Sequence, residues 1–256
     1  MKAKLLFLLV ALFATTTVNS QVMRAEELEK YAKERYGEKW TEAAENLASQ
    51  LSLDKNNSLT YEQIIDCGES TKEQLYVILN YWFTATFNDA NSVIKLNDKE
   101  LGTIIAEGYV ADIAGHMGGM NSYNVNIRPI IKVDIKDKRI RVTYTVQYYD
   151  IEKLSGGGIL SAVGESMGAL GGNPTPTKKE LLEEHWGLET CFPFAKKDKH
   201  KAKKTSSKAL VMTHAYSNVI MDKIEETVKN GLVGNENDGS VRKAGCNPCS
   251  RFQYYA

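Results

Sequence analysis

The chain of 256 residues has few histidines and cysteines, four of each. No recognisable set of nucleophile, general base and metal ligand occurs at a spacing that would bring the three together. The four histidines form no close ligand pair with the cysteines at the usual spacings of zinc sites: His116, His185, His200 and His214. We therefore predict a protein that is not an enzyme and that holds no metal and no cofactor.

Long apolar runs are also scarce, and the strongest one lies at the N-terminus. Residues 5–14 are uninterrupted apolar positions, too few for the roughly 20 residues of a membrane-spanning helix. Two lysines precede this run and small residues follow it, which is typical of a secretory signal peptide over residues 1–20. We predict cleavage after Ser20 and export as a soluble protein to the periplasm or the extracellular medium. The first cysteine is Cys67, far from the cleavage position, which disfavours a lipid anchor.

An excess of positive charge is absent as well. Lysine plus arginine and aspartate plus glutamate each total 32, and removal of the two lysines of the signal peptide leaves 30 basic residues against 32 acidic ones. A nearly neutral protein offers no general attraction to a polyanionic partner.

Cysteine is limited to four residues, for which export permits disulfides in three alternative pairings: Cys67, Cys191, Cys246 and Cys249. Cys246 and Cys249 have the spacing of a redox motif, but neither a strand before nor a helix after them is indicated. This context favours a structural disulfide or unpaired thiols over a catalytic pair.

Periodicity divides the remaining chain into segments. Residues 21–58 form an N-terminal helical appendage, with two helices that break near Gly37. Residues 59–67 are a strand, and Ser70 to Glu73 has the form of a capping box that begins a helix. Four β-rich runs follow, at 92–96, 100–110, 123–135 and 139–149.

The last of these runs alternates most regularly. Its apolar set is predicted to face the core: Ile140, Val142, Tyr144, Val146 and Tyr148. Its polar set is predicted to face solvent: Arg141, Thr143, Thr145, Gln147 and Tyr149. Such alternation is typical of an antiparallel sheet with one covered and one open face.

The chain after this sheet is less regular. Residues 151–204 are interpreted as a glycine-rich and lysine-rich insertion, which includes a short helix over 178–186 and a solvated lysine-rich linker over 196–204. Residues 206–229 are predicted to form the closing helix, with His214 facing solvent. Residues 231–256 are interpreted as a flexible C-terminal tail.

Four segments carry a resemblance to a known family: 59–65, 70–82, 102–108, and 131–135 together with 139–142. The chain resembles the domain of unknown function 4468 family, which has a fold like that of the TATA-binding protein (TBP) and occurs in exported proteins of Bacteroidetes-type bacteria. The resemblance implies an α+β domain over 59–230, with a TBP-like β-α-β-β-β-β-α antiparallel sheet and helices on one face. It implies no activity.

Because the resemblance is to a fold found in a DNA-binding protein, we asked whether the charge of this region suits nucleic-acid binding. Residues 59–150 contain nine basic and twelve acidic side chains, a net charge of −3. Binding of nucleic acid depends on neutralising phosphates, so this sign argues against it.

Three functions remain open. The first is a non-catalytic binding or interaction module for a protein, glycan or small-molecule ligand, which would bind the open face around Arg141, Thr143, Thr145, Gln147 and Tyr149. The second is a thiol-disulfide redox protein that uses Cys246 and Cys249. The third is a structural protein of the cell envelope, in peripheral contact through its glycine-rich and lysine-rich segments.

Overall fold

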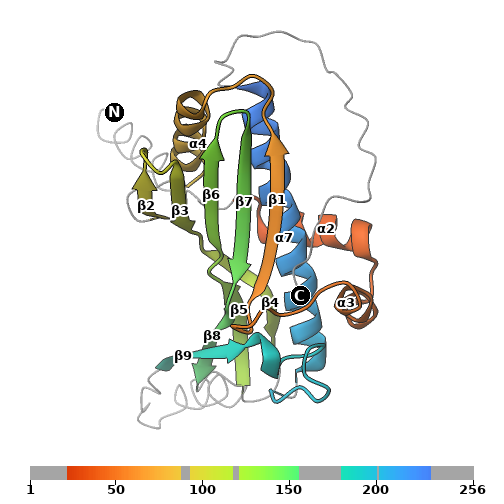
Figure 1. Ribbon diagram of the computed structural model, residues 1–256. Coiled ribbons are helices and arrows are strands. Elements are labelled where there is room, and N and C mark those ends of the chain that lie inside the picture. The colour runs from red at the N-terminus through yellow and green to blue at the C-terminus, as the bar shows by residue number, and fades with distance from the viewer. Residues whose placement is uncertain (1–21, 88–92, 118–120, 156–179, 201, 232–256) are drawn as a thin grey trace, which may run out of the picture.

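The computed structural model describes residues 22–87, 93–117, 121–155, 180–200 and 202–231, whose strands form two antiparallel sheets (Figure 1). The larger sheet has five strands in the order β1-β7-β6-β3-β2: β1 (Leu59–Asp66), β7 (Arg139–Val146), β6 (Ile130–Lys136), β3 (Thr103–Glu107) and β2 (Ile94–Asp98). The smaller sheet has four strands in the order β4-β5-β8-β9: β4 (Val110–His116), β5 (Asn121–Ile127), β8 (Tyr148–Ser155) and β9 (Glu180–Gly187).

One long helix joins the two sheets into a single core. Helix α7 (Lys203–Asn230) has 28 residues and passes behind both sheets in the view of Figure 1. At 1.5 Å per residue, such a helix spans about 42 Å. Helix α4 (Lys72–Thr86) packs beside α7, and α2 (Ala25–Tyr36) and α3 (Trp40–Ala48) pack against α7 as well. Among the residues that the structure describes, helices therefore cover one face of the larger sheet, which confirms the predicted α+β architecture.

Three of the predicted strands are each divided between the two sheets. The run 123–135 becomes β5 and β6, separated by Arg128 and Pro129. Proline has no N–H to donate and so interrupts a ladder of hydrogen bonds. The run 100–110 likewise becomes β3 and the start of β4, and the run 139–149 becomes β7 and the start of β8.

The last of these breaks changes which side chains face the core. Val142 and Val146 of β7 are fully buried, as predicted. After the exposed Gln147 the alternation shifts by one residue, so Tyr149 is buried at 1% exposure and Tyr148 is only half-buried. The outward placement predicted for Tyr149 is therefore wrong, because a period of two does not continue across a strand break.

The cap of α4 lies one residue later than predicted. The Gln74 N–H donates to Thr71 Oγ1 at 3.3 Å, and the Thr71 N–H donates to Gln74 Oε1 at 2.9 Å. The capping box is thus formed by Thr71 and Gln74, not by Ser70 and Glu73.

Two predictions for the C-terminal half are wrong. Residues 180–187 form strand β9 instead of a helix, because β8 offers them an antiparallel partner along their whole length. His214 is 5% exposed instead of solvent-facing, since α2 places Tyr36 against it, with 5.3 Å between the ring centroids. Its neighbours on α7, Thr213 and Ala215, are fully buried, so the middle of the helix is enclosed on all sides.

Part of the lysine-rich linker is folded. The ring of His200 stacks on Trp186 with 4.0 Å between centroids, and Asp198 accepts hydrogen bonds from the N–H groups of Phe192 and His200. Lys196, Lys197 and Lys199 remain exposed, as expected for a solvated charge run.

Candidate functional site

One side of the five-stranded sheet faces away from α7, and no helix of the described residues lies on it; we call this side the open face. Arg141, Thr143 and Thr145 lie on this face, where the sequence placed them. Arg141 is exposed and both threonines are half-buried. Arg141 stands opposite Ile64 of β1 on one side and Asp134 of β6 on the other.

The carboxylate of Asp134 contacts several polar side chains at the centre of the open face. Asp134 Oδ2 accepts a hydrogen bond from Arg141 Nη2 at 2.9 Å and forms an ion pair with Lys132 Nζ at 3.0 Å. Thr103 Oγ1 donates to Asp134 Oδ1 at 3.1 Å. Partial burial by itself would raise the pKa of Asp134, but its contacts with Lys132 and Arg141 outweigh that effect and lower the pKa. The carboxylate is thus kept charged, and it fixes two cations from neighbouring strands.

An apolar side chain lies exposed beside these charges. Ile64 of β1 is 62% exposed and stands opposite Arg141 of β7. The surface around it forms a shallow depression lined by Ile64, Asp134, Lys136, Arg139, Ile140 and Arg141. This depression combines apolar contact area with cations, the composition expected of a binding surface.

The other two predicted site residues lie elsewhere. Gln147 is exposed, but it sits between β7 and β8 at the junction of the sheets. Tyr149 belongs to the core, where burial raises the pKa of its hydroxyl well above the ordinary value. Tyr149 is therefore removed from the candidate site.

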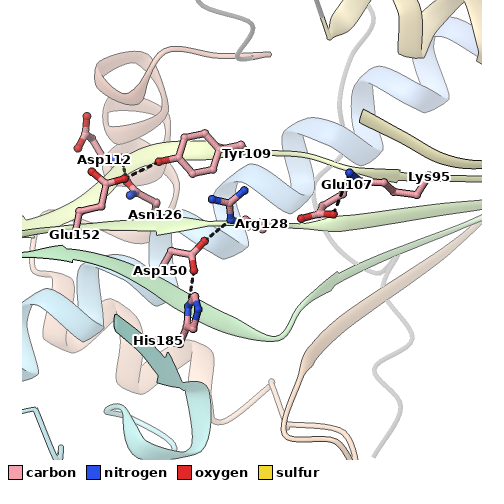
Figure 2. Close-up of polar contacts among 9 residues, drawn as sticks. All are labelled: Lys95, Glu107, Tyr109, Asp112, Asn126, Arg128, Asp150, Glu152 and His185. Carbon is pink, nitrogen blue, oxygen red and sulfur yellow. Dashed lines mark hydrogen bonds and ion pairs between the residues drawn. The ribbon is translucent and has the colours of Figure 1, made fainter. Parts of the chain in front are cut away.

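A second polar cluster occupies the junction between the sheets, and the sequence did not indicate it (Figure 2). Arg128 Nε donates to Asp150 Oδ2 at 2.7 Å, and His185 Nδ1 lies 2.7 Å from Asp150 Oδ1. The Asp150 side chain is only 10% exposed, whereas the side chains of Arg128 and His185 are 48% and 63% exposed. A nearly buried carboxylate is thus held between two accessible basic groups.

The same cluster includes an aromatic ring. Tyr109 Oη donates to Glu152 Oε1 at 3.1 Å, and the guanidinium carbon of Arg128 lies 4.9 Å from the centroid of the Tyr109 ring. Burial, with the hydrogen bond to Glu152 as a second cause, raises the pKa of Tyr109 to about 12. The Tyr109 hydroxyl therefore stays protonated at neutral pH and is unsuited to act as a base.

The junction cluster escaped sequence analysis because its members come from four separate places in the chain. Tyr109 precedes β4, Arg128 precedes β6, Asp150 lies in β8 and His185 lies in β9. The sequence predicts a helix over 178–186, which includes His185. The pair Arg128-Pro129, at which a strand must break, was the one local signal of a junction.

Metal-ligand groups and thiols were also considered among the described residues. They contain no group of three side chains from histidine, cysteine, aspartate and glutamate that could hold a metal ion. Cys67 and Cys191 are both buried and free, and burial raises the pKa of the Cys191 thiol to about 12. Cys246 and Cys249 lie outside the described residues. Within the described part of the chain, no helix is both long enough and apolar enough to span a bilayer.

Comparison with known proteins found one family model and solved structures to which this chain is similar. A family described as "Domain of unknown function (DUF4468) with TBP-like fold" matches residues 61–149. A TBP-like protein from Parabacteroides distasonis has a similar structure at 13% identity and a TM-score of 0.45, covering 70% of this chain and 97% of its own. A DUF4468 family protein from Bacteroides ovatus is similar at 12% identity and a TM-score of 0.40, covering 68% of this chain and 88% of its own. No curated protein matches the sequence.

Proposed function

We propose, on the premise that residues 61–149 belong to the DUF4468 family with a TBP-like fold, that the chain is an exported, non-catalytic binding module. In this proposal a protein, glycan or small-molecule ligand contacts the open face. The observation that carries it is the pairing of an exposed aliphatic side chain, Ile64, with cations that Asp134 holds in fixed positions. Pre-positioned side chains lose little conformational freedom on binding, so their contacts contribute more to affinity.

Two features support a binding role over a catalytic one. The polar clusters at Asp134 and Asp150 join carboxylates to cations. The one threonine among them, Thr103, donates to the Asp134 carboxylate, whose charge Lys132 and Arg141 already neutralise, so it has no free base to activate it. The N-terminal apolar run supports the proposal that binding takes place in the periplasm or outside the cell.

Site-specific photocrosslinking in cells that produce the protein tests this function. A benzophenone amino acid is placed at Thr143 on the open face, with Thr84, which is exposed on α4 on the helix-covered side, as the matched control. We expect a crosslinked species from position 143 that position 84 does not form, and a weaker yield when Arg141→Ala is added. Equal crosslinking at both positions, or none at position 143, would contradict the proposal.

A further inference from the structure

The two edges of the five-stranded sheet differ in how well they are protected. Edge strands expose backbone N–H and C=O groups, and proteins guard them with short length, lysine, proline or β-bulges. The edge strand β2 has five residues, a register shift between Ile94 and Leu96, and an exposed lysine, Lys95. These are three of the usual protective features.

The edge strand β1 has none of these features. It has eight residues and pairs with β7 in unbroken register from Leu59 to Asp66. It contains no proline, lysine or arginine. In the part of the chain that the structure describes, no strand pairs with its outer side. Figure 1 shows β1 as the last strand of the larger sheet.

The remaining sheet edges are guarded in other ways. Strand β4 has a register shift between Val110 and Ala114, and Asp112 within that interval has a left-handed backbone, with φ at 56°. Strand β9 carries acidic residues at the adjacent positions Glu183 and Glu184, which face opposite ways, whereas both acidic residues of β1 lie on one face. β1 is thus the regular edge with the fewest obstacles to a further strand.

The side chains of β1 also indicate what kind of strand fits. On the open face, Glu62 and Asp66 flank the exposed Ile64 at alternate positions. Cross-strand neighbours of opposite charge stabilise antiparallel pairing, and like charges oppose it. β1 carries two acidic residues and no basic one, so pairing with a second copy of β1 in the register that sets Ile64 opposite Ile64 places Glu62 opposite Asp66.

We propose that β1 receives an extended segment of a partner protein, which adds antiparallel to its free edge and lengthens the sheet. At every second position, on the open face, this segment carries a basic, an apolar and again a basic residue. Backbone hydrogen bonds to β1 supply affinity in such strand addition, and alternate side chains supply specificity. The lysines or arginines of the segment pair with Glu62 and Asp66, and an apolar residue between them packs on Ile64. This proposal concerns the sheet edge, so its failure leaves binding on the open face untouched.

A synthetic peptide tests the edge directly. The probe is a capped, fluorescently labelled nine-residue peptide, Lys-Thr-Val-Thr-Lys-Thr-Val-Thr-Lys, in which lysine and valine alternate on one face of the strand. Its binding to the full chain is measured by fluorescence anisotropy. A control peptide of the same sequence carries N-methyl groups at every second residue and so loses one row of backbone donors. Each backbone hydrogen bond contributes roughly 0.5–1.5 kcal/mol, so we expect binding at least about tenfold weaker for the methylated peptide.

Charge variants separate strand addition from general attraction. Glu62→Gln with Asp66→Asn removes two acidic groups from β1, and Glu34→Gln with Glu38→Gln removes two exposed ones from the N-terminal helical region. We expect about fivefold weaker binding in the first variant, at roughly 0.5 kcal/mol per ion pair, and no change in the second. Any of three results overturns the proposal: no binding, equal binding of both peptides, or a concentration-dependent dimer that Ile64→Lys abolishes.

Discussion

His214 illustrates how position within the core sets the behaviour of a single titratable residue. Its Nδ1 lies 3.3 Å from the hydroxyl of Tyr61, and its ring packs against Tyr36 and Tyr61. Burial, with the positive charge of Arg35 as a second and smaller cause, lowers the pKa of His214 to about 4. The folded protein therefore keeps this imidazole neutral at neutral pH.

This lowered pKa predicts a loss of stability on mild acidification. Between pH 6.5 and about 4 the unfolded chain binds a proton at His214 that the folded chain does not bind, so unfolding becomes easier as pH falls. This loss of stability is small above pH 6.5 and grows to roughly 3 kcal/mol by pH 4. Urea unfolding at pH 7.5, 6.5 and 5.5 measures the slope of this dependence.

The variant His214→Gln should flatten the dependence between pH 6.5 and 5.5. His200, whose pKa is also lowered, chiefly by partial burial, contributes in the same direction and leaves a residual slope. His116→Gln, at an exposed position, serves as the control and should keep the wild-type slope. An unchanged slope in His214→Gln would contradict the role of burial at this residue.

At the scale of elements, the cap of α4 makes a sharp prediction. Thr71→Ala removes the side-chain acceptor at the start of this helix and should cost about 0.5–2 kcal/mol of stability. Ser70→Ala is the matched control, because Ser70 contributes its backbone: its N–H donates to Cys67 O and its carbonyl accepts from the Lys138 N–H. Thermal unfolding of both variants checks this, and an equal loss in the two would place the cap elsewhere.

The elements themselves could be predicted where local patterns decide the structure. The first strand, the helix that follows it and the two N-terminal helices all follow from periodicity and from the break at Gly37. Strand breaks were harder, because β7 and β8 read as one alternating run although the chain crosses between sheets at Gln147. The error at Tyr149 follows directly, since one irregular residue inverts every later side chain.

Contacts between distant segments account for the remaining errors. Strand β9 was assigned to a helix because its partner β8 cannot be inferred from local sequence. Arg141, Thr143 and Thr145 were placed correctly on the open face, since they share one regular strand. The cluster of Arg128, Asp150 and His185 forms only when the strands of the smaller sheet pair, so local sequence patterns could not predict it.

At the scale of the whole molecule, the N-terminal helices are part of the core. Leu28 of α2 is fully buried, and Trp40 of α3 is 8% exposed. Both helices pack on α7, which also runs along both sheets. One helix that contacts every layer couples their stabilities, so the described part of the chain should unfold in a single transition.

Leu28→Ala tests this coupling. Truncating a fully buried leucine should cost roughly 2–5 kcal/mol and lower the urea midpoint. Three tryptophans lie in different layers, Trp40 in α3, Trp82 in α4 and Trp186 in β9, so their fluorescence and far-ultraviolet circular dichroism should report the same lowered midpoint. The control Leu101→Ala, at a residue 73% exposed, should stay within about 0.5 kcal/mol of the wild type. If α2 and α3 were instead a separate unit, Leu28→Ala would produce an early partial transition while the main midpoint stayed unchanged, because the loss would not reach α7 and the sheets behind it.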